Sequence, residues 1–247
     1  DGRQVALGNE KEQDTAWMKY VEACTIESKA TTEPADIKIE VARGGEYKIR
    51  LEDGTTVWLN SESSLIYPEK FTGDKRAVRL SGEGYFEVAR DEKKPFIVSV
   101  TDMEIKVLGT KFNVTAYQDE KMTTTTLISG AVEVVTPHRS VQLQPGKQAM
   151  VQEGGDDITV LEVDVELATS WTAGIFKFDK MALTDICTRL SRWYDIDFVF
   201  EGETGKEKFT GGTWKYVPLK DFLSKIERVT NVLFLFENNT VKVVPKK

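Results

Sequence analysis

The stretch Ala77-Val-Arg-Leu-Ser-Gly-Glu-Gly-Tyr-Phe-Glu-Val88 alternates apolar and polar side chains on both sides of Gly82. A period of two is typical of β-strands with one buried face and one solvated face. The pattern therefore predicts two strands, 77–80 and 84–88. A glycine inside such a pattern predicts a β-bulge.

The same alternation recurs from residue 36 to about residue 165, and turn sequences such as Asp53-Gly54 and Pro145-Gly146 separate the runs. Many short strands at roughly 8–12-residue spacing predict an antiparallel sandwich, barrel or roll. We therefore expect an all-β first domain, residues 1–165, built as an antiparallel sandwich or roll of many short strands. Further predicted strands cover residues 47–51, 56–60, 96–100, 103–107, 111–114, 131–135, 140–143 and 148–151.

A repeat without gaps marks the C-terminal part, where residues 182–201 align with residues 218–237. Each copy starts with apolar residues at helical spacing and ends in an alternating strand. Because a strand also precedes each helix, the segment reads as a duplicated β-α-β unit, and residues 240–244 add a last strand. We expect a small α+β domain over residues 171–247, with two helices on one face of a mixed sheet. The two predicted helix faces are Leu183, Ile186, Cys187, Leu190 and Trp193, and Leu219, Phe222, Leu223, Ile226 and Val229.

Bulk composition is that of a soluble folded chain, with 40% apolar and 30% charged residues among 247. The net charge of -7 would repel a phosphate backbone, so no nucleic-acid partner is expected. The apolar runs are far shorter than the ~20 residues of a membrane helix. The sequence begins at Asp1 rather than Met, so we expect a mature chain or an excised soluble part.

Enzymatic signatures are scarce. The single histidine, His138, falls in a predicted turn. Glu83 and Glu87 share a strand face, as a glycosidase pair might, although a solvated outer face explains the same spacing. We predict no catalytic residue, no cofactor and no metal ligand. Cys187 lies on an apolar helix face, which favours a buried thiol, and a disulfide with Cys24 stays open.

Aromatic residues are the other candidates for binding. Some of those near the ends of elements must be partly exposed, and exposed aromatic side chains often anchor partners. Four strand-borne aromatics form either a sugar-stacking platform or part of the core: Trp58, Tyr67, Tyr85 and Phe86. Four others lie at helix or strand ends: Trp193, Tyr194, Trp214 and Tyr216.

Several of these motifs, in this order, resemble the FecR family, and most closely its members from Bacteroides-type bacteria. The resemblance covers nearly the whole chain from about Val41 onward, whereas residues 9–35 are the least readable part. The motifs that carry it are Gly44-Gly-Glu-Tyr-Lys-Ile-Arg-Leu-Glu-Asp-Gly-Thr-Thr-Val-Trp-Leu-Asn60, Leu80-Ser-Gly-Glu-Gly-Tyr-Phe-Glu-Val88, Val107-Leu-Gly-Thr-Lys-Phe-Asn-Val114, Leu143-Gln-Pro-Gly-Lys-Gln-Ala149 and Leu190-Ser-Arg-Trp-Tyr-Asp195.

The resemblance implies a transmembrane anti-sigma regulator in cell-surface signalling and transcription regulation. A cytoplasmic N-terminal segment would hold an extracytoplasmic-function sigma factor, and one membrane helix would follow it; neither lies within this sequence. The present chain would be the periplasmic region, and its C-terminal part would be similar to the STN domain. Its expected partner is the N-terminal signalling domain of a TonB-dependent outer-membrane transporter. The alternatives are a carbohydrate-binding β-domain that senses glycan directly and an enzyme that uses Glu83 and Glu87.

A terminal strand independently suggests a protein partner. We expect the strand 240–244 to lie at the edge of its small sheet, where a strand of another chain could add. The predicted partner-binding residues are therefore Thr240, Lys242 and Val243, together with Trp193, Tyr194, Trp214 and Tyr216.

Overall fold

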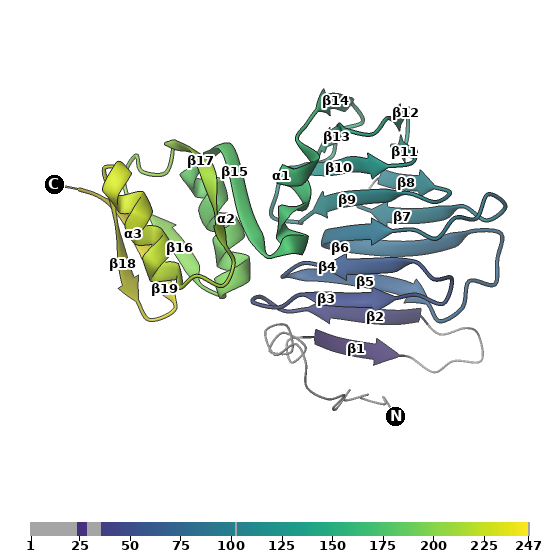
Figure 1. The fold of residues 1–247 in the computed structure, drawn as a ribbon, viewed down its shortest axis with the longest axis horizontal. Helices are drawn as coiled ribbons and strands as arrows, with labels where there is room; N and C mark the ends of the chain where they lie inside the picture. Colours follow the sequence, from purple (N-terminus) through teal and green to yellow (C-terminus); the bar gives the residue numbers. More distant parts are fainter. Residues whose placement is uncertain (1–23, 29–35, 102, 247) are drawn as a thin grey trace. The chain divides into compact units, whose positions relative to one another are not determined.

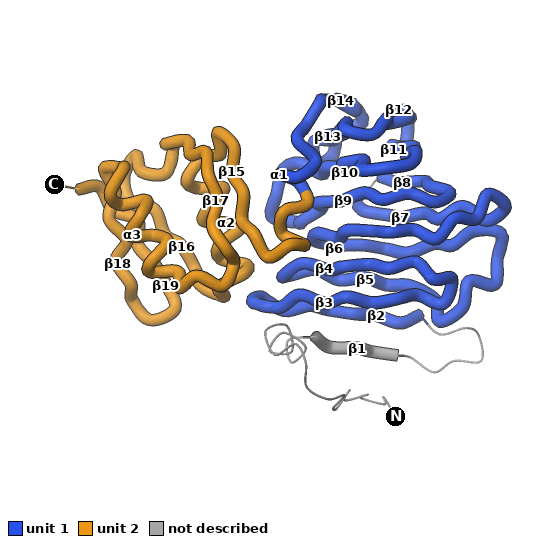
Figure 2. Tube along the Cα trace, viewed as in Figure 1, with its two compact units in different colours: residues 1–168 blue, residues 169–247 orange. Residues whose placement is uncertain are grey.

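The computed structural model describes residues 24–28, 36–101 and 103–246, and for residues 24–28 the backbone alone. The chain divides into two compact units, residues 1–168 and 169–247 (Figure 2). Each unit has its own strands and its own buried side chains, and each is described by itself below. Among the described residues, no helix has the length and apolar character needed to cross a membrane.

Unit 1 is built from strands, and fourteen of them within the described residues join one sheet (Figure 1). The strands are β1 (Cys24–Ser28), β2 (Asp36–Val41), β3 (Tyr47–Arg50), β4 (Thr56–Leu59), β5 (Ser63–Pro68), β6 (Arg76–Glu87), β7 (Phe96–Val100), β8 (Met103–Val107), β9 (Lys111–Ala116), β10 (Met122–Ser129), β11 (Val132–Val135), β12 (Ser140–Leu143), β13 (Lys147–Gln152) and β14 (Ile158–Glu162).

Strand β6 connects the two halves of this sheet. Its first half pairs with β5 and β7, and its second half pairs with β4 and β9. A straight strand of this length would span about 40 Å. Nevertheless, the guanidinium of Arg76, at the start of β6, donates to the carbonyl oxygen of Ala89, just beyond its end, over 2.8 Å. The strand therefore folds back on itself, so that its halves lie in two facing layers.

The fold-back occurs at Gly82. This residue has a φ of +92°, which L side chains rarely adopt, and a Cβ there would lie 2.7 Å from the Cα of Ser63. The Ser63 hydroxyl also accepts a hydrogen bond from the Glu83 N–H at 2.8 Å, so a backbone donor at the bend is satisfied. Only glycine fits both the backbone conformation and the space.

The fold class expected for this region is wrong. Instead of an antiparallel sandwich or roll of many short strands, the structure has one continuous, nearly closed, barrel-like sheet. The predicted strands 77–80 and 84–88 are a single strand, β6, and its pairing with β7 is parallel. Alternation detects each half of β6, but it does not show that one strand serves both layers.

The core of unit 1 lies between the layers and is made of alternate strand residues. Phe86 on β6 stacks on Phe112 of β9, with ring centroids 5.0 Å apart, and it also contacts Phe96 of β7 at 6.3 Å. All three rings are fully buried. Burying side chains of this size stabilises the fold by about 2–3 kcal/mol each.

A buried ion pair joins the start and the end of β6 to the turn before β4. The guanidinium of Arg76, 2% exposed, lies 2.7 Å from the carboxylate of Asp53 and donates to the carbonyl oxygens of Ala89 and Lys94. Asp53 also accepts hydrogen bonds from the backbone and the hydroxyl of Thr55. Because both charges are withdrawn from water, each depends on the other to offset its desolvation.

We expect Gly82→Ala to destabilise the protein by about 3 kcal/mol, because alanine meets both the unfavourable φ and the overlap with Ser63. Urea unfolding measures the change. The matched control is Gly73→Ala, where a Cβ would meet no atom within 4 Å and the change should stay within about 1 kcal/mol. Equal stability of the two variants would contradict the assignment of the bend to Gly82.

Removing the charge of Asp53 should be similarly costly. Asp53→Asn is expected to lose about 3 kcal/mol, because the Arg76 charge stays buried without its counter-ion. The control is Asp36→Asn, which breaks the exposed pair between Arg79 and Asp36 and should cost less than about 1 kcal/mol. Similar losses in the two variants, measured by urea unfolding, would show that burial does not set the strength of the Arg76 pair.

Unit 2 contains two longer helices and five strands within the described residues. Its elements are β15 (Ile175–Ala182), α2 (Leu183–Tyr194), β16 (Asp197–Phe200), β17 (Lys208–Trp214), α3 (Leu219–Val229), β18 (Val232–Glu237) and β19 (Thr240–Pro245). The short helix α1 (Val165–Thr169) and a 3-10 turn, Ser170–Ala173, precede them. The spacing correctly predicts the buried faces of both helices, except that Val229 is 74% exposed.

The strands of unit 2 do not form the predicted β-α-β units. Strands β15 and β17 pair with each other in an antiparallel two-stranded sheet, and β16, β19 and β18 form a separate three-stranded sheet. The two strands that flank each helix therefore lie in different sheets, so the expected duplicated β-α-β domain is wrong. Helix packing contributes to this arrangement, since Phe176 and Phe178 of β15 pack on Trp193 of α2 and Phe222 of α3.

Candidate functional site

The seven predicted partner-binding residues lie on helix α2, at the end of β17 and in the turn after it, and on strand β19, and they differ sharply in exposure. Trp214 at the end of β17 is 60% exposed and Tyr216 is 53% exposed. Trp193 is buried, and its Nε1 donates to the carbonyl oxygen of Lys215 at 2.8 Å. The hydroxyl of the half-buried Tyr194 donates to the same oxygen at 3.0 Å. The structure thus brings these four aromatics together around Lys215, with two inside and two outside.

The edge predicted at residues 240–244 does not exist. Strand β19 is the middle strand of its sheet, because β16 pairs with it on one side and β18 on the other. Val243 is fully buried, and Lys242 lies 2.7 Å from Glu237, whose hydrogen bond raises the pKa of Lys242. Thr240 is half-buried in the same strand. Strand order in a sheet need not follow chain order, and this explains the error.

Lys215 is the residue of this site that the sequence pattern did not single out. Its side chain is 1% exposed, and its ammonium lies 4.3 Å from the ring centroid of Trp193, 5.4 Å from that of Trp171 and 5.6 Å from that of Phe176. The faces of aromatic rings attract a cation, and the attraction strengthens when water is excluded. A signal was available, because Lys215 directly follows Trp214, the last residue of β17, and successive residues of a strand point to opposite faces.

The aromatic cage determines how the flanking residues are presented. The backbone N–H of Lys215 donates to the carbonyl oxygen of Gly174 at 2.9 Å, and its own carbonyl accepts from Trp193 and Tyr194. Tyr216 in turn packs edge-on against Trp193, with ring centroids 6.0 Å apart. These contacts hold the end of β17 against β15 and α2. The position of Trp214 on the outer surface is therefore set by the contacts of the residues that follow it.

Burial lowers the pKa of Lys215 to about 7. Between about pH 7 and the ordinary lysine pKa near 10.4, the unfolded chain therefore holds a proton that the folded chain has released. Stability gains from this group as pH rises through that window, and the gain is absent below pH 7, where both states are protonated.

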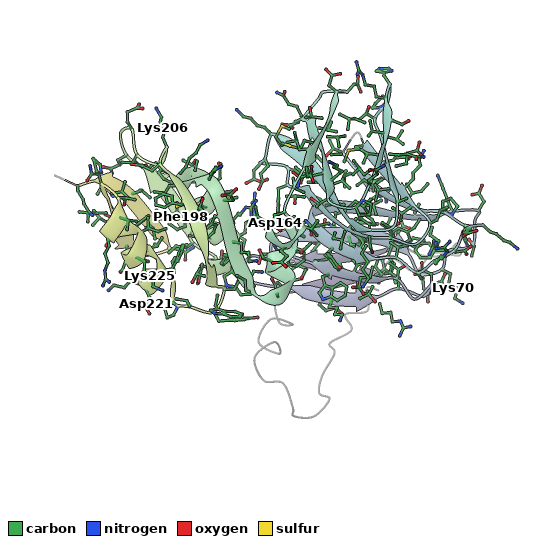
Figure 3. All side chains as sticks on the ribbon, turned by 45° about the horizontal axis from the view of Figure 1, so that its top comes forward. Lys70, Asp164, Phe198, Lys206, Asp221 and Lys225 are labelled. Carbon is green, nitrogen blue, oxygen red and sulfur yellow. The ribbon has the colours of Figure 1, made fainter. Side chains whose placement is uncertain are left out.

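We expect the difference in unfolding free energy between wild type and Lys215→Met to shift with pH in that window, by up to about 1.4 kcal/mol per pH unit. Urea unfolding of both proteins between pH 6 and pH 10 measures it. Lys225→Met, on the exposed face of α3 (Figure 3), is the control and should differ from wild type by a constant amount. A constant difference for Lys215→Met as well would show that Lys215 does not change protonation on folding.

The candidates in unit 1 are engaged in the fold. The Glu83 carboxylate accepts hydrogen bonds from Asn60 at 2.8 Å, Asn113 at 3.0 Å and Thr115 at 3.2 Å. The Glu87 carboxylate lies 2.8 Å from the ammonium of Lys111. Both carboxylates thus hold neighbouring strands together. His138 is 77% exposed in its side chain and lies 3.7 Å from Asp156.

The sugar-stacking platform is not formed. Tyr67 and Phe86 are buried in the core. Trp58 and Tyr85 meet edge to face at 5.3 Å on the outer side of β4 and β6, but the ammonium of Lys48 covers the Trp58 ring at 4.2 Å. A sugar would have to displace Lys48 before it could stack there.

Other parts of the described structure offer no reactive centre. Cys187 is a free, buried thiol whose pKa burial raises, whereas the side chain of Cys24 lies outside the described residues. No group of three or more His, Cys, Asp or Glu side chains that could hold a metal occurs in the described ranges. A groove of about 610 Å³ passes over Leu108 and Ala131 in unit 1, but two of its charged residues, Arg90 and Glu92, pair with each other at 2.6 Å.

Two family models match the sequence. The model described as FecR protein matches residues 37–133, within unit 1, and the model described as FecR, C-terminal, matches residues 175–243, within unit 2. A search of curated protein sequences found no match.

Two crystal structures of a protein from Parabacteroides distasonis, provisionally described as an anti-sigma factor, are similar to this chain. They were determined at 1.65 Å and 2.50 Å resolution, and both are 30% identical to the chain with a TM-score of 0.79. The alignments cover 85% and 86% of the present chain and 99% and 100% of the two solved chains.

Proposed function

The chain belongs to the FecR family of anti-sigma factors, and from this premise we propose that it is the periplasmic relay of a signalling regulator. In this proposal, unit 2 binds the N-terminal signalling domain of a TonB-dependent outer-membrane transporter. Binding then controls an extracytoplasmic-function sigma factor through a membrane helix and a cytoplasmic segment outside this sequence. The family is one of regulators and is not a known enzyme family.

One observation carries the assignment of the docking surface, namely the exposed pair Trp214 and Tyr216 held in place by the buried Lys215. Large aromatic side chains dominate binding energy when a partner covers them. A surface that is rigid before binding also loses little conformational entropy. In the part of unit 1 that the structure describes, no comparable aromatic surface favours direct glycan sensing, since Lys48 covers Trp58.

Binding to the purified signalling domain of the transporter encoded beside this protein tests the proposal. We expect saturable binding by calorimetry, and we expect Trp214→Ala to weaken it by about tenfold or more. Val229→Ala is the matched control, because Val229 is an apolar residue at the end of α3 that is even more exposed than Trp214. Its affinity should stay within about twofold of wild type.

Two outcomes would contradict the proposal. Absence of binding by the folded wild-type chain would exclude this partner. Equal affinity of Trp214→Ala and wild type would exclude the aromatic pair as the docking surface. Val243→Pro is unsuitable as a docking variant, because a proline in the buried middle strand would disrupt the sheet itself.

A further inference from the structure

Strand β17 has an open edge. It pairs with β15 on one side, and no other strand of the described residues pairs with it. Five of its seven residues are exposed, among them the adjacent glycines Gly211 and Gly212. The strand contains no proline, and an open edge of this kind can accept a strand from another chain.

The hydrogen-bonding groups of this edge can be assigned by alternation. The Lys215 N–H donates to Gly174, so Lys215 and Thr213 direct their backbone groups toward β15. The amides of Gly212 and Trp214 must then point to the open side. Gly212 lies close against β15, since a Cβ there would come within 2.7 Å of the Phe176 carbonyl oxygen, and Trp214 lies beside Ile175 at the end of the strand.

Strand β18 also lies at the edge of its sheet and exposes an aromatic side chain. It is less suited to the addition of a strand from another chain. Its Phe234 N–H already donates to the carboxylate of Glu227 on α3 at 2.7 Å, so a side chain of the same unit occupies the outward donor. Strand addition to β18 would first have to break this charge-assisted bond. Among the described contacts, no side chain accepts a hydrogen bond from the N–H of Gly212 at the edge of β17.

Charge indicates the chemistry of the incoming segment. Residues 169–247 carry 13 Lys and Arg against 10 Asp and Glu, a net charge of +3 in a chain of -7. The two strands of this sheet carry three lysines, Lys177 and Lys180 on β15 and Lys208 on β17, and one acid, Asp179, which accepts a hydrogen bond from Thr210 at 3.0 Å. This excess of positive charge attracts an acidic segment and repels a basic one.

We propose that the open edge of β17 receives an extended acidic segment of the transporter's signalling domain as a third strand. Backbone hydrogen bonds to Gly212 and Trp214 would hold the segment, and the Trp214 ring would anchor an apolar side chain at its end. The inference rests on the proposed function, because it names the docking mode and the chemistry of the same partner.

Amide hydrogen exchange, followed residue by residue by NMR on the full chain with the purified signalling domain, tests the docking mode. We expect exchange at Gly212 and Trp214 to slow by about tenfold or more on binding. The amides of Thr213 and Lys215, which already face β15, serve as internal controls and should change little. Docking through side chains alone would not produce this alternation.

The possible results separate the inference from the proposed function. Saturable binding with unchanged exchange at Gly212 and Trp214 would overturn the strand addition and leave the partner intact. Absence of binding would overturn the proposed function and the inference with it. Protection that appears without partner and rises with the chain's own concentration, together with a dimer in sedimentation, would show that a second copy occupies the edge and would also overturn the inference.

Charge reversal tests the chemistry of the segment. Lys208→Glu should weaken binding about fivefold at low salt, and the loss should shrink as salt screens the charges. The matched control is Lys225→Glu on α3, whose affinity should stay within about twofold of wild type. Equal losses in both variants, or none in Lys208→Glu, would contradict recognition of an acidic segment by the β17 edge.

Discussion

The bend of β6 at Gly82 is the constraint on which unit 1 depends. Because β6 folds back and belongs to both layers, its two ends lie close together. Arg76, at the start of the strand, can therefore contact both Ala89 and Asp53. The next strand, β7, then returns beside the start of β6 and pairs with it in parallel. Parallel neighbours usually need a crossover of a dozen or more residues. Here the fold-back shortens the connection to residues 88–95, so the bend replaces the crossover helix.

Both units bury cationic side chains, and two of them, Arg76 and Lys215, offset the cost of desolvation in different ways. Arg76 in unit 1 has a carboxylate and two carbonyl oxygens, which suit the fixed donors of a guanidinium. Lys215 in unit 2 has aromatic faces, and burial lowers its pKa to about 7. A guanidinium stays charged, so the first site is a permanent cross-link. The ammonium of Lys215 can lose its proton near neutral pH, so the contribution of this residue to the stability of the fold changes with pH.

The sequence contained enough information to place most strands and both helix faces, as Ile186 and Phe222 show, because alternation and helical spacing are local properties. Pairing is not local. The halves of β6 looked like two strands, since the pattern on either side of Gly82 does not reveal that the chain folds back there. For the same reason the middle position of β19 was missed, because β16 joins it from an earlier part of the chain. Lys215 was overlooked since lysine is rarely buried, although its place directly after the outward Trp214 favours an inward direction.

A sheet with an open edge can bind a strand of a partner efficiently when its edge strand is already ordered. Two-stranded sheets are marginal by themselves, and this one depends on the packing of Phe176 and Phe178 against the helices and on the Lys215 cage. With β17 held in this way, an incoming strand would meet backbone donors that are already aligned. The cost of ordering would then fall on the partner's segment alone. The open edge also exposes the chain to unwanted pairing, and the excess of lysines on β15 and β17 opposes addition of a second copy of the same sheet. The features that would admit an acidic segment are thus the ones that disfavour self-association.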